Sequence, residues 1–216
     1  MSRALFILLL GLLVPTHAAA FSVRVVIDGV PTRWENPVIE YYLQQAGSDD
    51  LTPEQSLTAV RTAFKSLEEI ACATVSFVEL GDAPNPNLLI LAGHAPNGQN
   101  ELAWIEDEKW TMGKWVLGVT SPIIGQDGLL HEADIAFNGL HLKWSVTGKN
   151  GTDLESVAVH EIGHMIGMQH NLGPYSWKQP PTMAPNIAPN NKSRSLEVDD
   201  KNCVCFLYPI EGGWSC

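Results

Sequence analysis

The sequence predicts a single domain of the α+β class, an α/β sandwich in which helices pack against a sheet. Two observations predict it. Short apolar runs that end at Gly, Pro or Asn are typical of strands, and they lie before and after a segment whose apolar residues recur at helical spacing. Further helical segments follow in the C-terminal part. The 216 residues are enough for one domain with a buried core.

The predicted strands are all short. Residues 38–43 (VIEYYL) are rich in the β-branched and aromatic residues that favour strands. Turn-forming residues bound the other predicted strands, which are residues 74–80, 88–91, 116–121 and 133–137.

The first helix is predicted over residues 53–71. Thr52 can cap its start, Pro53 suits the first helical position, and Gln55 completes a capping box. Apolar residues then recur at helical spacing, at Leu57, Val60, Phe64, Leu67 and Ala71. The segment is therefore an amphipathic helix with one buried stripe.

Two later segments are also predicted to be helical. The sequence Thr152-Asp-Leu-Glu155 reads as a second capping box, so a helix begins just before a histidine-rich stretch. Its apolar positions, which can pack on the sheet, are Leu154, Ala158, Ile162 and Met165. The last helix is predicted over residues 196–207, before Pro209.

The N-terminal residues have the layout of a secretory signal peptide. Arg3 precedes an apolar run over residues 4–14, and small residues at 18–20 offer a cleavage site. The run is shorter than the roughly 20 apolar residues of a membrane helix. We therefore expect residues 1–20 to be removed and residues 21–216 to form one secreted, monomeric domain with no separate pro-domain. Its location would be extracellular, or the periplasm in a Gram-negative host.

Charge and cysteine content narrow the function further. The formal net charge is −11, and no stripe of Lys and Arg is visible, which argues against nucleic acid or an anionic membrane as partner. Four cysteines in an exported chain predict two disulfides among Cys72, Cys203, Cys205 and Cys216. The pairing stays open, but at least one bridge should join Cys72 to the C-terminal segment. The alternative is buried free thiols.

Residues 160–170 (HEIGHMIGMQH) have the spacing of a metal site. His160 and His164 are four residues apart, so on a helix they lie about 6 Å apart along the axis and can bind one ion. Gly167 can adopt a left-handed conformation that ends the helix. His170 then arrives from outside the helix as a third ligand, and the site suits Zn²⁺.

Glu161 makes a catalytic site more plausible than a structural one. Three imidazoles leave the fourth position of a tetrahedral zinc open for water, and zinc lowers the pKa of that water to about 7. Glu161 can take the proton of the water as general base and return it as general acid to a leaving amine. The residues therefore predict hydrolysis of a peptide bond.

HEIGHMIGMQH resembles the metzincin zinc signature HExxHxxGxxH, and the wider chain resembles the matrixin branch, the family of the matrix metalloproteinases. The resemblance implies a zincin-like catalytic domain with a twisted mixed sheet of about five strands, three helices and zinc at the cleft. It also implies that Asp199 and Asp200 in LEVDDKNCVCFLYP anchor the C-terminal helix and brace the site.

The resemblance assigns roles outside the zinc motif. PTMAP places Met183 in a tight turn beneath the zinc, with Pro185 in the wall of the pocket for the side chain after the cut bond. WVLGVTSPI resembles the edge strand along which substrate lies, so the predicted substrate-binding residues are Val116, Leu117, Gly118, Val119 and Pro185.

The sequence signals for further metal sites and for control of latency are weaker than the signal for the first zinc site. The second zinc site of the family lacks its His-x-Asp cluster here, so His94, His131 and His141 are expected at the surface, and calcium stays open. IDGVP resembles the inhibitory segment of the family with Asp28 in place of cysteine, so Asp28 could ligate zinc. The alternative is a strand over residues 23–27 followed by a turn at Asp28.

The predicted function is therefore a secreted zinc endopeptidase that cleaves extended protein substrates. A secreted non-catalytic module that keeps zinc for binding or inhibition is one alternative. A peptidase of narrow specificity that processes one partner is the other. Four tryptophans in the middle of the chain could line the cleft, but core packing is expected for most of Trp104, Trp110, Trp115 and Trp144.

Overall fold

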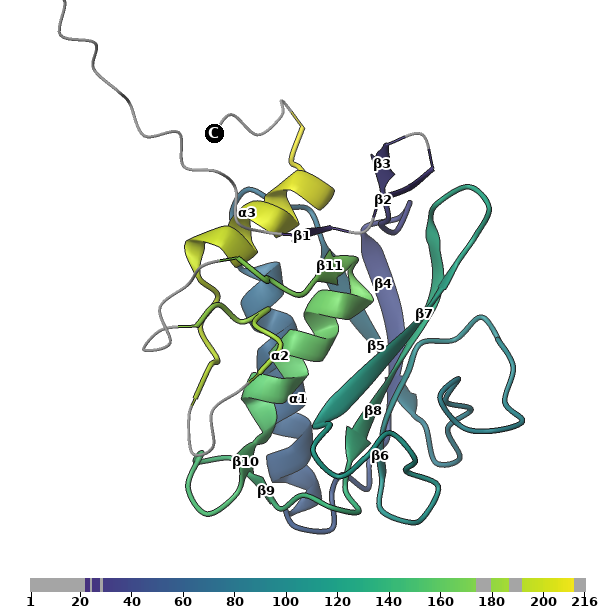
Figure 1. The fold of residues 1–216 in the computed structure, drawn as a ribbon, viewed down its shortest axis with the longest axis vertical. Helices are drawn as coiled ribbons and strands as arrows, with labels where there is room; N and C mark the ends of the chain where they lie inside the picture. Colours follow the sequence, from purple (N-terminus) through teal and green to yellow (C-terminus); the bar gives the residue numbers. More distant parts are fainter. Residues whose placement is uncertain (1–21, 24, 28, 174–179, 187–191, 212–216) are drawn as a thin grey trace, which may run out of the picture.

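The computed structural model describes residues 22–211 except 24, 28, 174–179 and 187–191, and Figure 1 shows its two layers, a sheet and a pair of helices. The sheet has five strands in the order β5-β4-β6-β8-β7. Their bounds are β4 Val38–Leu43, β5 Ser76–Asp82, β6 Glu101–Ile105, β7 Gly118–Ile124 and β8 Leu130–Asn138. Neighbours from β5 to β8 are parallel, whereas β7 runs antiparallel to β8 at the edge. The predicted mixed sheet and edge strand are confirmed.

Three helices in the described part of the chain complete the α+β domain, as predicted. They are α1 Pro53–Glu68, α2 Leu154–Met165 and α3 Val198–Leu207. Helices α1 and α2 lie side by side along one face of the sheet (Figure 1). The predicted apolar face of α2 is fully buried in the main core, with Leu154, Ala158, Ile162 and Met165 each 0% exposed. Burial of this face fixes which way the polar side chains of α2 point.

The remaining strands are short pairs. β1 (Ser22–Val23) pairs with β11 (Met168–Gln169), and β2 (Val25–Ile27) forms a hairpin with β3 (Val30–Pro31). β9 (Trp144–Ser145) pairs in parallel with β10 (Thr152–Asp153). The strand expected over residues 23–27 is therefore present as two pieces, and Gly29 turns the hairpin with φ +78°.

Two of the predicted helix boundaries change. The capping box of Thr52 and Gln55 is present, but α1 ends at Glu68 rather than at residue 71. The cap of α2 was assigned one residue too early. Asp153, not Thr152, caps the helix by accepting a hydrogen bond from the Ser156 amide, because the β9–β10 pair extends through Asp153 and the helix begins only at Leu154.

The strand predicted over residues 88–91 is wrong, and β6 was missed. Leu88 is buried, but Leu91 N donates to Leu88 O in a turn, and the Leu89 amide donates to the Asp134 carboxylate. Further amides of the same long loop donate to Glu101 and Glu132. These buried carboxylates take the hydrogen bonds that a strand would use. The strand in this region, β6, begins at Glu101. Glutamate is less common in strands than β-branched and aromatic residues, so this residue did not indicate one.

One disulfide joins Cys72, just after α1, to Cys205 in α3, across 133 residues of sequence. This confirms that a bridge joins Cys72 to the C-terminal segment. Cys203 is buried and free within the described residues, and Cys216 lies outside them. No helix in the described part has the length and the apolar character that a membrane span requires.

Candidate active site

Helix α2 supplies two of the three predicted zinc ligands, and a glycine turn supplies the third. His160 and His164 lie one turn apart on the helix. Gly167 has φ +101°, and its amide closes the helix end by donating to His164 O. A Cβ at Gly167 would collide with the Thr32 carbonyl oxygen, so only glycine fits the turn. The chain reverses there and brings His170 back to the helix, as predicted.

The three imidazoles converge through their Nε2 atoms. The distance from His160 Nε2 to His170 Nε2 is 3.1 Å, and the distance from His164 Nε2 to His160 Nε2 is 3.2 Å. Tetrahedral zinc with Zn–N bonds of about 2.05 Å places its nitrogen ligands about 3.3 Å apart. This cluster, alone among the described residues, has the compactness of a metal site, and its spacing fits zinc.

Main-chain carbonyls orient two of the imidazoles. His160 Nδ1 lies 2.7 Å from Thr182 O, and His164 Nδ1 lies 2.9 Å from Met168 O. Because a carbonyl only accepts, each Nδ1 must carry the proton, which leaves Nε2 with a free lone pair for a metal. Burial lowers the pKa of both imidazoles to about 4, so they are neutral at physiological pH. Neutral imidazole is the form that binds zinc.

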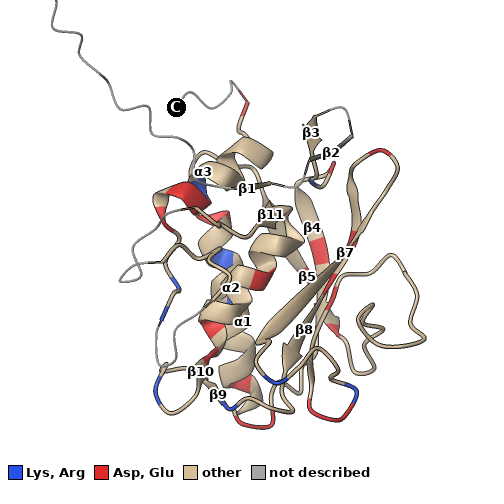
Figure 2. Ribbon diagram, viewed as in Figure 1, with Lys and Arg blue, Asp and Glu red and all other residues tan. Residues whose placement is uncertain are grey.

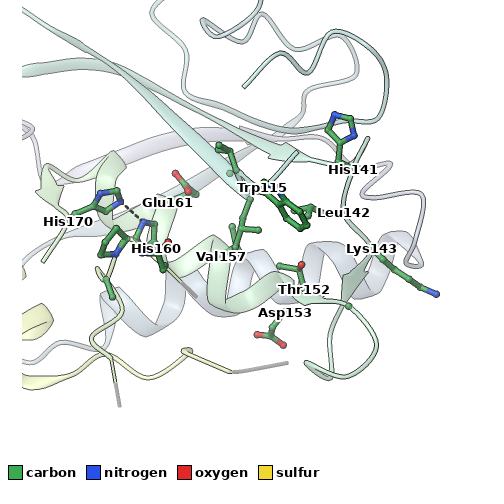
Figure 3. Close-up of a pocket in the computed structure, with 17 residues that line it drawn as sticks. Trp115, His141, Leu142, Lys143, Thr152, Asp153, Val157, His160, Glu161 and His170 are labelled. Atoms are coloured by element: carbon green, nitrogen blue, oxygen red, sulfur yellow. Dashed lines mark hydrogen bonds between the residues drawn. The ribbon is translucent and has the colours of Figure 1, made fainter. Parts of the chain in front are cut away.

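Glu161 lies on the side of α2 that faces the edge strand, beside the histidines (Figure 3). Its side chain is buried, and burial raises the pKa of the carboxyl. The Thr120 hydroxyl of β7 lies 2.7 Å from Glu161 Oε2. Glu161 therefore has the placement expected of a proton acceptor next to a metal rather than that of a ligand.

Met183 lies beneath the histidine cluster in the turn that the sequence indicated. It is 2% exposed, and a Cβ built on Gly163 of α2 would lie 2.5 Å from Met183 Sδ, so the turn packs directly against the zinc helix. The Met183 carbonyl accepts a hydrogen bond of 2.7 Å from the Asn171 amide. The turn is thereby tied to the segment that carries His170.

The start of α3 is acidic (Figure 2) and holds this turn in place. Asp200 is 1% exposed and accepts hydrogen bonds from the amides of Thr182 and Met183, at 2.9 and 3.3 Å. Asp199 accepts from the Asn171 side chain at 2.6 Å. Burial raises the pKa of Asp200 to about 6. The two aspartates occupy the places that the resemblance predicted for them.

A cavity of about 680 Å³ opens beside the histidines, between α2 and the segment that leads into β7. Val116, Leu117, Gly118 and Pro185, four of the five residues predicted to bind substrate, line it. Leu142, Val157 and the exposed Trp115 also line it, and Figure 3 shows them beyond the histidines. The other three tryptophans noted in the sequence are buried.

Some predicted site residues do not reach the cavity. The Val119 side chain packs in a separate small core with Leu88 and Trp110, so only its backbone lies on the substrate side of the edge strand. Asp28 lies outside the described residues. His94 and His131 are exposed, as expected, whereas His141 is exposed but lines the cavity. Thr120 was not predicted to be a site residue. Its contact with Glu161 depends on how β7 packs on α2, which no local sequence pattern indicates.

The fold and the three-histidine site together define the metzincin class. A family model described as Peptidase_M10, matrixin, matches residues 33–209. The chain belongs to the matrixin family.

Named relatives agree with this family. The chain is 30% identical to metalloendoproteinase 1-MMP of Arabidopsis thaliana over 84% of its own length and 45% of the relative. It is 28% identical to metalloendoproteinase 4-MMP of the same plant, over 82% and 48%, respectively. Karilysin of Tannerella forsythia is 26% identical over 65% of this chain and 27% of karilysin. The chain thus spans less than half the length of each of these three relatives.

Proposed function

We propose that this protein is a secreted zinc endopeptidase that cleaves extended polypeptides. The observation that carries the proposal is the convergence of three imidazoles beside one buried carboxylate at the mouth of a largely apolar cavity. His160, His164 and His170 would hold the zinc, which when bound polarises a water molecule and the substrate carbonyl. Residues 1–20 would direct export and be removed.

Glu161 moves the proton in this mechanism. It accepts a proton from the attacking water and then delivers it to the nitrogen of the leaving amine. Met183 and Asp200 touch no substrate. Their role is to fix the Thr182 carbonyl, which holds the His160 ring in place.

The edge strand is where substrate binds. β7 has a partner on one side only among the described strands, so its outer backbone can pair with an extended peptide. Gly118 at its start lies directly against Glu161, because a Cβ there would come within 2.9 Å of Glu161 Oε1. A peptide on β7 therefore passes in front of the carboxylate.

The cavity beside the histidines selects the side chain that follows the cut bond. Its walls include the side chains of Leu117, Leu142 and Val157. A space of about 680 Å³ exceeds the volume of any one side chain, so size does not exclude the larger apolar residues. We expect a preference for long aliphatic and aromatic residues.

A digest of a peptide library tests the proposal and its rivals. Mass spectrometry of products formed by the zinc-loaded protein should show internal cuts, with Leu, Met, Phe or Tyr enriched directly after the cut. A preference for charged residues there would contradict the assigned pocket. Cleavage of very few sequences would favour the narrow processing peptidase. No cleavage by fully zinc-loaded protein would favour the non-catalytic module.

A further inference from the structure

We propose that Thr120 is a positioning residue whose hydroxyl holds the Glu161 carboxylate in the orientation that proton transfer requires. The inference rests on the proposed function, because it assigns a role within that mechanism. Thr120 lies in β7, outside the zinc motif. The proposal rests on two hydrogen-bond contacts between Thr120 and Glu161 and on the burial of Glu161.

The Thr120 hydroxyl touches Glu161 twice. Oγ1 lies 2.7 Å from Glu161 Oε2 and 2.9 Å from the Glu161 main-chain oxygen. A hydroxyl has one proton to donate, and an ionised carboxylate is a stronger acceptor than a neutral carbonyl. The shorter contact is also the one with the carboxylate. We therefore assign the proton of the hydroxyl to the bond with Oε2.

Thr120 is the sole hydrogen-bond partner of this carboxylate in the described part of the chain. The helix fixes the Glu161 backbone but not its side-chain torsions, and each free torsion would spread the carboxylate over several positions. Gly118 lies two residues before Thr120 on the same face of β7, and a Cβ there would come within 2.9 Å of Glu161 Oε1, so the missing side chain leaves room at that oxygen. One oxygen of the carboxylate is thus held by Thr120, and the other stays open beside Gly118.

In this arrangement the two oxygens of the Glu161 carboxylate have different roles. Oε2 is occupied by the Thr120 proton, and Oε1 keeps its lone pairs for the proton of the attacking water. The bond to Thr120 persists after that transfer, since a protonated carboxyl still accepts through its other oxygen. The acid then gives its proton to the leaving amine from a fixed position. A correctly held proton carrier can be worth an order of magnitude or more in rate.

A purely structural role is the competing explanation. Thr120 is β-branched, which suits a strand, and its contact with the Glu161 main-chain oxygen could simply join β7 to α2. Two substitutions separate these roles. Thr120→Val keeps the shape and removes the hydroxyl, whereas Thr120→Ser keeps the hydroxyl and removes the methyl group.

Kinetics on zinc-loaded protein form the first part of the test. T120V should lower kcat by about 5–30-fold, with KM within about twofold and zinc content unchanged. T120S should stay within about threefold of the parent. The matched control is Thr62→Val, which removes an exposed hydroxyl that bonds within α1, away from the cavity, and should leave kcat unchanged. A wild-type kcat in T120V, or a loss that T120S shares fully, would overturn the proposal.

The second part needs neither zinc nor activity. In metal-free protein, T120V should lower Tm by about 3–8 °C, because it leaves a buried carboxylate without its partner. In an E161A background the same change should lower Tm by at most about 2 °C. Equal shifts in both backgrounds would show that the hydroxyl and the carboxylate are not coupled, which also overturns the proposal.

The two proposals fail in different ways. If the zinc-loaded parent cleaves no peptide, the proposed function is refuted, and the positioning role falls with it even where the Tm cycle shows coupling. If the parent cleaves and T120V matches it, only the positioning role is refuted.

Discussion

Replacing Glu161 by glutamine is expected to lower kcat by about 10²–10⁴-fold while the protein keeps its zinc. Glutamine has nearly the shape of glutamate and can accept the Thr120 hydrogen bond through its amide oxygen, but it cannot take up a proton. Because Glu161 faces the edge strand and is not one of the three converging ligands, zinc affinity should change little. Initial rates on one fluorogenic peptide, with zinc content measured on the same samples, check both statements.

Glu155→Gln is the matched control for this variant. Glu155 lies in the first turn of the same helix, where it forms an ion pair of 2.7 Å with Arg194 and lines no part of the cavity. Its loss should leave kcat within about twofold, since ion pairs with partly exposed groups contribute little. Unchanged proteolysis in E161Q would refute the general-base mechanism, even if the protein proved to be a zinc peptidase.

Removing the disulfide should produce the largest loss of stability. A double variant C72S/C205S is expected to lose about 3–5 kcal/mol of unfolding free energy, because the bridge closes a loop across 133 residues. Unfolding in urea, followed by tryptophan fluorescence, measures the difference. Reduction of the parent should lower its stability by a similar amount and should change the double variant little.

The same bridge supports the site. It holds α3 through Cys205, and the first turn of α3 carries Asp200, which fixes the turn of Met183. We therefore expect the double variant to bind zinc more weakly as well as to unfold more readily. A variant as stable as the parent would contradict the role of the bridge in closing the domain.

The zinc motif was predictable because its spacing is local. On any helix, residues four apart share a face, so His160 and His164 could be paired without knowledge of the fold. The turn at Gly167 follows from the same reasoning, because glycine tolerates positive φ. The capping box at Thr52 is equally local, and it too is present.

The errors occurred where distant groups compete for backbone hydrogen bonds. The apolar run over residues 88–91 is not a strand because Asp134, 45 residues beyond Leu89, takes one of its amides. The cap of α2 is Asp153 rather than Thr152 because pairing with β9 keeps both residues extended, so the helix begins only at Leu154. Neither long-range pairing is visible in a local sequence pattern.

The surroundings of Glu161 depend on tertiary packing in the same way. Thr120 reaches Glu161 across 41 residues of sequence, and Asp200 reaches Met183 across 17. The family resemblance indicated that Asp200 braces the site, but it gave no role to Thr120. Sequence patterns thus identified the groups that would bind zinc and move protons, whereas the structure identified what holds them.

The central claim is that one zinc ion, held by His160, His164 and His170, is required for peptide cleavage. Titration of the metal-free protein with zinc, with cleavage of one peptide measured at each step, tests it most directly. Activity should be absent at the start, rise in proportion to added zinc and level off at one equivalent. Cleavage by the metal-free protein, or full zinc loading with no cleavage, would contradict the claim.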